Sequence, residues 1–324
     1  MKAVMMLSGG LDSLLALKLV LEQGIEAHAL HFTSAFSPDR SAEGARRAAG
    51  QMGVPLTVED MTEGLLQLVH TAPHGRGAGM NPCIDCRIMQ LRLAKELMTR
   101  LGAGFVVTGE VLGERPMSQR RGALEVIERD SGLEGLIVRP LCALALEPSR
   151  PELEGWVDRS RLLGITGRRR TPQIELAARL GITEYPQPAG GCRLTEPGYA
   201  RRMRDLVAHG GAALEDLPLL PLGRHFRPAP GALLVVSRTE QENAPLEAAA
   251  RPGDRLLRAR GLPGPTALLR GEADARALRD AASITARYGK GRTEPLVTVV
   301  VTGAQELCVE VPPATQELLD RVRI

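Results

Sequence analysis

Aromatic side chains are scarce in this 324-residue chain and make up only 2% of it. The apolar content of 44% is ordinary, so aliphatic side chains are expected to fill the core. Lysine is also rare, and most positive charges are arginines, whose planar guanidinium groups suit phosphate oxygens. The net charge of +3 is too small to identify a nucleic-acid-binding protein by itself.

Long hydrophobic runs are absent, which excludes a membrane-spanning segment. The amino-terminal run Ala3–Leu7 is too short for a secretory signal, and a Gly-Gly-Leu-Asp turn follows it at once. We therefore predict a buried first strand and a cytoplasmic protein. Cysteines are few, five in all, and in the cytoplasm metal binding or redox chemistry is expected of them rather than disulfide formation.

The first half alternates short apolar runs with helical patterns, which predicts an α/β fold with a mostly parallel sheet. Expected strands are Ala3–Leu7, Ala27–Phe32, Pro55–Val58, Phe105–Thr108 and Leu136–Leu141, and expected helices are Ser13–Gln23, Ala42–Met52 and Ile88–Leu101. The Gly- and Pro-rich stretch Thr71–Asn81 is predicted to be an active-site loop. A second loop is marked by Pro186, Pro188, Gly190 and Gly191.

A different pattern follows a group of prolines at Pro218, Pro221, Pro228 and Pro230, which suggest an interdomain boundary. Expected strands there are Ala232–Val236, Arg255–Arg260, Thr266–Leu269 and Val297–Val301, and expected helices are Asp274–Arg287 and Thr315–Val322. We therefore predict three parts: a domain over 1–170, a connecting segment over 171–222 that carries Cys192, and a small α+β domain over 223–324.

The loop between the first strand and the first helix is built for phosphate. It consists of Ser8, Gly9, Gly10, Leu11, Asp12 and Ser13. Its glycines let backbone N–H groups approach an anion, and the helix N-terminus adds the positive end of a dipole. Asp12 is placed to position a magnesium ion.

This SGGLDS sequence resembles the PP-loop of the adenine nucleotide α-hydrolase-like superfamily. The resemblance implies a Rossmann-like, HUP-type sheet and an enzyme that cleaves ATP between the α and β phosphates and passes AMP to a substrate oxygen. It further implies nucleotide contacts at the end of the second strand, beside the adenine, and at the end of a later strand. These are His31, Phe32 and Thr33, and then Gly109 and Glu110 in Thr108-Gly109-Glu110.

Cys83 and Cys86 form a CxxC pair before a predicted helix, and Cys192 follows two glycines. We expect the helix N-terminus and Arg87 to lower the thiol pKa values of the pair. The three cysteines allow a 4Fe–4S cluster with one open iron, a catalytic thiol pair that carries a persulfide, or a zinc site. Cys142 and Cys308 are expected to be small buried hydrophobes.

A CxxC pair and a distant cysteine on a PP-loop domain resemble the iron–sulfur-dependent tRNA thiouridine synthetases. Over about 210 residues the resemblance implies ATP-dependent thiolation of a tRNA uridine, with Asp12, Cys83, Cys86 and Cys192 catalytic and a 4Fe–4S cluster on the three thiolates. Hydrosulfide or a sulfur carrier would donate the sulfur, and a homodimer is left open. Ser118 and Gln119 are candidate contacts to the nucleotide or target base, and Arg139 to phosphate.

Basic residues around Cys192 are predicted to contact an RNA backbone. They are Arg168, Arg169, Arg170, Arg201 and Arg202, with Arg204 beside them. Residues from 223 resemble the RNA-binding domain of NFACT-type proteins, through Gly223-Arg224-His225-Phe226, Leu262-Pro263-Gly264-Pro265 and Ala286-Arg287-Tyr288. That resemblance implies further RNA contacts at Arg224, Arg238, Arg287 and Lys290.

Two other functions fit parts of the sequence. A PP-loop ligase that adenylates a small carboxylate or amide would use the same loop without iron or RNA. A non-catalytic RNA adaptor would keep a relic loop, but the intact Asp12 and Ser13 argue against it.

Overall fold

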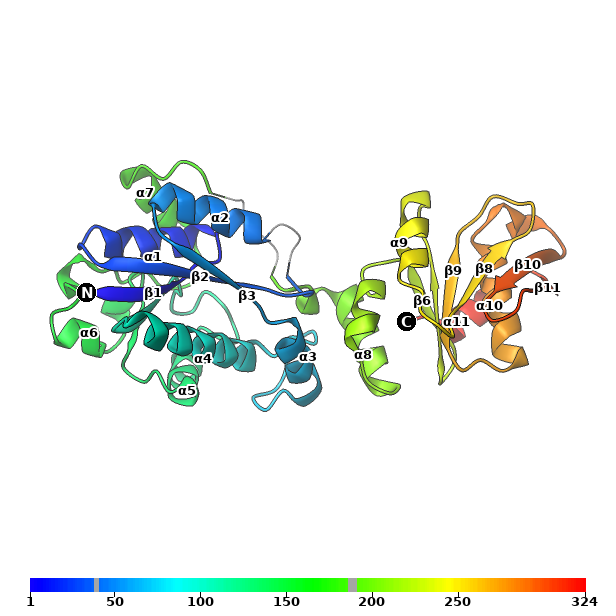
Figure 1. Ribbon diagram of the computed structural model, residues 1–324, viewed down its shortest axis with the longest axis horizontal. Coiled ribbons are helices and arrows are strands. Elements are labelled where there is room, and N and C mark those ends of the chain that lie inside the picture. Colours follow the sequence, from blue (N-terminus) through cyan, green and yellow to red (C-terminus); the bar gives the residue numbers. More distant parts are fainter. Residues whose placement is uncertain (38–40, 186–190) are drawn as a thin grey trace. The chain divides into compact units, whose positions relative to one another are not determined.

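The computed structural model describes residues 1–37, 41–185 and 191–324, and the chain forms two compact units, Met1–Glu196 and Pro197–Ile324 (Figure 1). The division lies earlier than the proline-rich boundary expected from the sequence, and it splits the segment 171–222 between the units. The predicted loop residues Pro186, Pro188 and Gly190 lie outside the described residues.

The first unit is built on a five-stranded parallel sheet in the order β3-β2-β1-β4-β5, which confirms the predicted Rossmann-like sheet. The strands are β1 (Lys2–Met6), β2 (Glu26–Thr33), β3 (Leu56–Asp60), β4 (Phe105–Thr108) and β5 (Ile137–Val138). The strand order reverses between β1 and β4. Loops that leave these two neighbouring strands therefore lie at the switch point, where such sheets bind ligands.

Helices cover both faces of this sheet (Figure 1). They are α1 (Leu11–Leu21), α2 (Ser41–Met52) and α7 (Thr171–Arg179) on one face, and α3 (Thr62–Thr71), α4 (Cys83–Leu101) and α5 (Arg121–Ser131) on the other. Shorter elements are α6 (Arg150–Leu153) and the 3₁₀ turns η1 (Ala143–Ala145), η2 (Arg159–Arg161) and η3 (Arg193–Thr195). Successive side chains of β1 belong to the hydrophobic clusters on opposite faces of the sheet. Met5 shares a cluster with Leu15 of α1, and Val4 shares one with Leu91 of α4. This burial on both sides explains why the first strand is an unbroken apolar run.

The second unit has a six-stranded antiparallel sheet in the order β11-β10-β8-β9-β7-β6. The strands are β6 (Arg224–Ala229), β7 (Ala232–Val236), β8 (Arg255–Ala259), β9 (Ala267–Gly271), β10 (Val297–Thr302) and β11 (Leu307–Val311). The helices are α8 (Pro197–Ala208), α9 (Asn243–Ala248), α10 (Ala275–Arg287) and α11 (Gln316–Val322), with 3₁₀ turns η4 (Leu214–Leu219), η5 (Glu240–Glu242) and η6 (Lys290–Thr293). Ala281, Ile284 and other small or aliphatic residues of α10 share a core with the sheet. The small α+β domain is thus confirmed.

Within the described ranges, no helix combines the length and the hydropathy needed to cross a bilayer.

Candidate active site

The loop between β1 and α1 has the shape of a phosphate cradle. Gly9 adopts a φ of +79°, and a Cβ there would lie 2.8 Å from the backbone of Gly44 and Ala45. Helix α1 begins without a side-chain cap at its N-terminus, which leaves first-turn N–H groups available to an anion. Ser13 Oγ donates to Gly10 O at 2.8 Å and lies 3.1 Å from Ser8 Oγ. The loop predicted from the sequence is therefore one compact turn at the switch point.

The loop after β4 lies directly against this turn. A Cβ on Gly109 would come within 2.6 Å of Ser13 N and 2.7 Å of its Cα, so only glycine fits between the two loops. Thr108 Oγ1 donates to the buried carboxylate of Glu110 at 3.1 Å. The predicted second loop is thus beside the first, and its contact with nucleotide stays a prediction.

Asp12 is surrounded by polar atoms that lack partners. Within the described part of the chain, no hydrogen bond of normal geometry reaches its Oδ1, the Nε of Arg170 or either amide atom of Gln173, although Gln173 lies close enough to Asp12 to affect its pKa, and Gln173 is 0% exposed. Burial raises the pKa of Asp12, while Arg170, Gln173 and Arg115 nearby oppose that rise. Buried polar groups are normally paired, so this cluster indicates a place that a polar ligand completes.

Two residues near Asp12 were not predicted from the sequence, and a third was predicted to have another role. Gln173 and Arg115 were not among the predicted site residues, whereas Arg170, predicted to contact RNA, lies beside Asp12. Glu114 also belongs to this neighbourhood, since burial and then the charge of Asp12 raise its pKa.

The predicted adenine-side residues end strand β2 and point in different directions. The ring of His31 is buried, its Nδ1 lies 2.9 Å from Leu7 O, and burial lowers its pKa, so the ring is neutral at pH 7. Its Nε2 has no partner among the described residues and is free to face a ligand. Phe32 packs on the α4 side of the sheet, and Thr33 donates to Asp60 Oδ2 at 3.2 Å. Of the three, His31 has a buried ring nitrogen without a partner among the described residues, and the predicted nucleotide contacts stay predictions.

The predicted cysteine trio is gathered in the first unit. Cys83 and Cys86 lie in the first turn of α4, and Cys192 immediately precedes η3. Met80 N donates to Leu194 O at 2.9 Å, which ties the loop before α4 to the turn after Cys192. Asn81 Nδ2 donates to Cys83 Sγ at 3.0 Å. Charge on Cys83 or Cys192 raises the pKa of Cys86, and charge on Cys83 raises the pKa of Cys192, so the three thiols share one neighbourhood.

The thiol of Cys86 is not activated in the way the sequence suggested. Burial, with the nearby thiols adding to it, raises the pKa of Cys86 to about 12, and burial raises that of Cys192 to about 11. The predicted lowering by Arg87 is therefore wrong for Cys86, because loss of solvent outweighs the guanidinium charge. Among the described residues, no three His, Cys, Asp or Glu side chains are already arranged to hold a metal ion.

Alkylation of Cys86 by iodoacetamide in metal-free protein should accelerate about tenfold for each pH unit from 7 to 10. The thiolate is the nucleophile, and at a pKa of about 12 its fraction still grows across that whole range. Site-resolved mass spectrometry measures the rate. A rate that levels off below pH 8 would mean a low-pKa thiolate instead.

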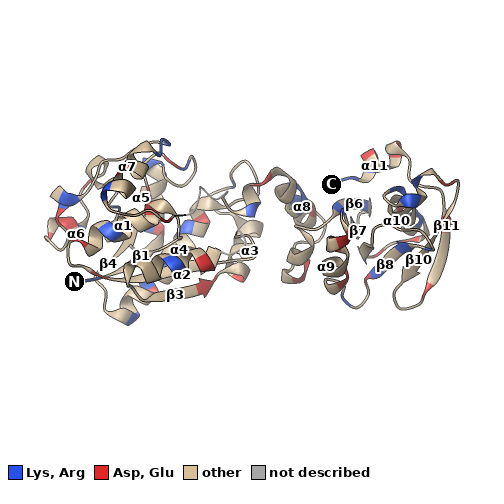
Figure 2. Cartoon of the chain, turned by 90° about the horizontal axis from the view of Figure 1, so that it is seen from above, with Lys and Arg blue, Asp and Glu red and all other residues tan. Residues whose placement is uncertain are grey.

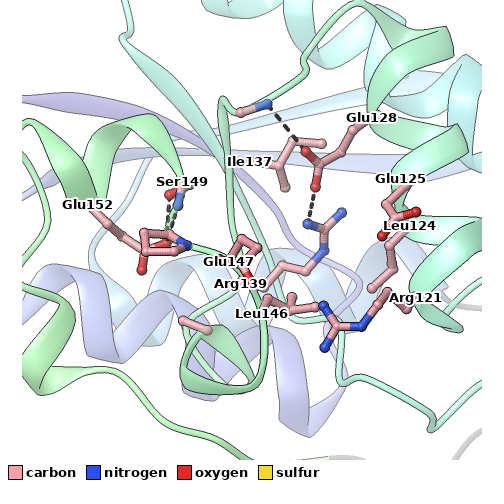
Figure 3. A pocket seen from close by; sticks show the side chains of 13 residues that line it. Arg121, Leu124, Glu125, Glu128, Ile137, Arg139, Leu146, Glu147, Ser149 and Glu152 are labelled. Carbon is pink, nitrogen blue, oxygen red and sulfur yellow. Dashed lines mark hydrogen bonds and ion pairs between the residues drawn. The ribbon is translucent and has the colours of Figure 1, made fainter.

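A buried chain of charges joins the cysteine helix to a cavity on the far side of β5. Arg87 Nε lies 3.0 Å from Glu110 Oε1, and Arg139 Nε lies 3.0 Å from Glu110 Oε2. Arg139 also pairs with Glu128, in a cavity of about 230 Å³ that Arg121 lines as well (Figure 3). Although burial opposes ionisation, Arg87 and Arg139 hold the pKa of Glu110 below its usual range. Arg139, predicted to contact phosphate, is thus already neutralised by two carboxylates.

The remaining cysteines differ from each other. Cys142 is buried, as predicted, and its thiol donates to Glu110 O at 3.2 Å. Cys308 was predicted to be buried, but it is exposed, because β11 lies at the edge of its sheet.

In the second unit, three of the predicted RNA contacts line one cavity of about 880 Å³: Arg238, Arg287 and Lys290. Arg292, which the sequence did not suggest, lines it too. Arg224 lies beside the cavity with its guanidinium 4.6 Å from the ring centre of Tyr288. Arg202 instead donates to the carbonyl oxygens of Leu220 and Gly223, and Arg201 is exposed. Arg168 and Arg169, which belong to the first unit, are also exposed. Positive and negative segments are interspersed over both units (Figure 2), so the cavity is a local basic site.

Fold and loop together define the class: a PP-loop α/β unit joined to a small antiparallel-sheet unit. Residues 1–147 match the family described as thiamine biosynthesis protein (ThiI), and residues 223–322 match the NFACT protein RNA binding domain. Most of the first unit is thus similar to the ThiI family, and most of the second unit is similar to the NFACT-type RNA-binding domain.

Several curated relatives match part of this chain. The tRNA-specific 2-thiouridylase MnmA of Desulfosudis oleivorans is 31% identical over 32% of this chain and 30% of its own length. The MnmA of Acidothermus cellulolyticus is 27% identical over 67% of this chain and 60% of its own. The probable tRNA sulfurtransferase of Staphylococcus aureus is 34% identical over 35% of this chain and 28% of its own. The chain therefore spans between 28% and 60% of the length of these relatives.

Proposed function

We propose that this chain is an ATP-dependent tRNA uridine sulfurtransferase that works in the cytoplasm. The observation that carries the proposal is a phosphate loop with unpaired polar atoms around Asp12, in the same unit as three interacting thiols. The ThiI and NFACT matches, and the names of the relatives, support tRNA as the substrate.

In the first step, the PP-loop N–H groups and the N-terminus of α1 bind the ATP phosphates. The target uridine oxygen attacks the α phosphate, pyrophosphate leaves, and the N3 proton is lost. Magnesium fits beside Asp12, because the buried Oδ1 has no other partner and carboxylate oxygen is a preferred ligand. The ion would offset the charge of the departing pyrophosphate.

In the second step, a sulfur nucleophile replaces the activated oxygen. The donor set of Cys83, Cys86 and Cys192 fits a 4Fe–4S cluster, since bound iron would stabilise three thiolates that otherwise disfavour one another. When bound, the cluster would supply an open iron for the sulfur atom. Asn81 would hold Cys83 through its 3.0 Å hydrogen bond. Iron and sulfide content after anaerobic reconstitution separates this arrangement from a persulfide on a cysteine pair.

The basic cavity of the second unit is proposed to hold the tRNA backbone. Replacing Arg287 and Lys290 together by alanine should weaken tRNA binding and lower the slope of log K against log salt by about one unit per lost phosphate contact. Fluorescence anisotropy over a salt series measures both. The control replaces Arg276 and Arg279, which are exposed on α10 outside the cavity. Equal losses in the two variants would assign binding to net charge rather than to this cavity.

The proposal is tested by mass spectrometry of tRNA nucleosides from cells with and without the gene. Loss of one thiouridine, restored by the wild-type gene, is expected. Unchanged nucleosides, with ATP–pyrophosphate exchange driven by a small acid, would favour the PP-loop ligase.

A further inference from the structure

Arg115 is carried by a loop that its own hydrogen bonds close. Gly113 N donates to Gln119 O at 2.7 Å, and Gln119 N donates to Arg115 O at 3.2 Å. The side chain of Gln119, which is 5% exposed, accepts from Arg115 N at 2.9 Å. These bonds fix the backbone from which the guanidinium extends. Gln119, predicted as a contact to nucleotide or base, therefore holds the backbone of Arg115 in place.

The guanidinium of Arg115 reaches from the phosphate loop toward the third cysteine. Its Nη1 lies 3.8 Å from the position a Cβ would take on Gly191, the residue before Cys192. On the other side, its charge acts on the carboxylates of Asp12 and Glu114. The side chain is exposed, and no carboxylate within the described ranges lies within ion-pair distance of it. Among the described residues, Arg115 is thus a cation without an ion-pair partner between two parts of the site.

Other cations near the site are placed differently. Arg87 is paired with the buried Glu110, and Arg139 with Glu110 and Glu128. Arg170 lies near Asp12 with its Nε buried, at the N-cap of α7 rather than at the Cys192 turn. Of these four arginines, Arg115 is the one that lies near Gly191 and also acts by its charge on Asp12.

We propose that Arg115 is a catalytic residue that contacts the phosphate of the adenylated uridine while sulfur displaces AMP. This inference rests on the proposed function and adds a residue to its second step. Because Gly191 has no side chain, the guanidinium and an adenylated base can both lie beside Cys192.

The step places negative charge where Arg115 can meet it. Hydrosulfide-level sulfur forms a C–S bond with the ring carbon, the C–O bond breaks, and its electron pair leaves on the oxygen of AMP. The sulfur-bound proton then moves to N3, which lost a proton during adenylation, and the thiocarbonyl forms without net oxidation. Both the entering sulfur and the leaving AMP are anionic, so a fixed cation between them stabilises the transition state.

Three variants of the full chain test the role in single-turnover reactions with the tRNA substrate: Arg115→Gln, Arg115→Lys and, as control, Arg120→Gln at a neighbouring exposed arginine. Adenylation is measured as pyrophosphate exchange into ATP with tRNA present and sulfur withheld. Thiolation is measured on preformed adenylated tRNA after sulfur is added.

For Arg115→Gln we expect exchange within about threefold of wild type and thiolation about 10²-fold slower, with adenylated tRNA accumulating. Arg115→Lys should recover about tenfold of that loss, and Arg120→Gln should match wild type. Equal losses in both steps, or no loss in either, would overturn the role of Arg115. If the wild type itself produces no thiolated tRNA, it is the proposed function that fails.

Discussion

Replacing Asp12 by asparagine should slow the formation of AMP by at least about 10³-fold while leaving the cysteine region intact. Asparagine keeps the shape of the side chain but removes the charge that would position magnesium against the departing pyrophosphate. The expectation follows from the buried, unpartnered Oδ1 at the start of α1. Pyrophosphate release in the presence of tRNA measures the effect.

Asp158→Asn is the matched control, since this exposed aspartate caps η2 through Ser160 and lies outside the phosphate loop. It should release pyrophosphate at the wild-type rate. The alkylation pattern of Cys83, Cys86 and Cys192 should be the same in both variants. If Asp12→Asn kept more than about a tenth of the wild-type rate, the site would not use this carboxylate in the way described.

The converse result is expected for Cys192→Ser. Pyrophosphate exchange should stay within about threefold of wild type, because Cys192 is not part of the PP-loop, whereas formation of thiouridine should fall by at least about 10³-fold. A cluster mechanism further requires that the variant lose iron on anaerobic reconstitution. Quantitative mass spectrometry of the product tRNA and an iron assay provide the readouts.

Cys308→Ser is the control for loss of a thiol, because Cys308 is exposed on β11 in the second unit. It should thiolate tRNA normally. Normal thiolation by the Cys192 variant would remove the third cysteine from the mechanism, and full iron retention combined with lost thiolation would place Cys192 in a persulfide pair.

Local sequence predicted most of the first unit and its phosphate loop. The six residues of the SGGLDS turn are contiguous, so the sequence alone shows the whole loop. Its glycines allow close backbone contacts, such as the approach of Gly9 to the backbone of Ala45. The parallel sheet was predictable because strands buried on both faces are apolar throughout.

Strands with mixed chemistry were harder to predict. β6 contains Arg224, His225 and Pro228, and it is stabilised by pairing with β7 rather than by an apolar pattern of its own. β11 is an edge strand with mostly exposed residues, which also explains why Cys308 is exposed. Tertiary pairing, which is not encoded in local periodicity, decides both cases.

The polar residues around Asp12 depend on the fold as a whole. Gln173 lies 161 positions after Asp12 and comes to it only because α7 packs on the same face of the sheet as α1. Arg115 faces Gly191 because the loops after β4 and before η3 meet in space. Similarly, the direction of the Cys86 pKa depends on burial, which outweighs the neighbouring Arg87.

Oxygen tracing tests the central claim that AMP is passed to a uridine oxygen. A tRNA substrate carrying ¹⁸O at the oxygen to be replaced is incubated with ATP, the protein and a sulfur source. The mass of the released AMP is then measured by mass spectrometry. The account predicts AMP that is two mass units heavier, in equal amount to the thiouridine formed. Thiouridine accompanied by unlabelled AMP would contradict it.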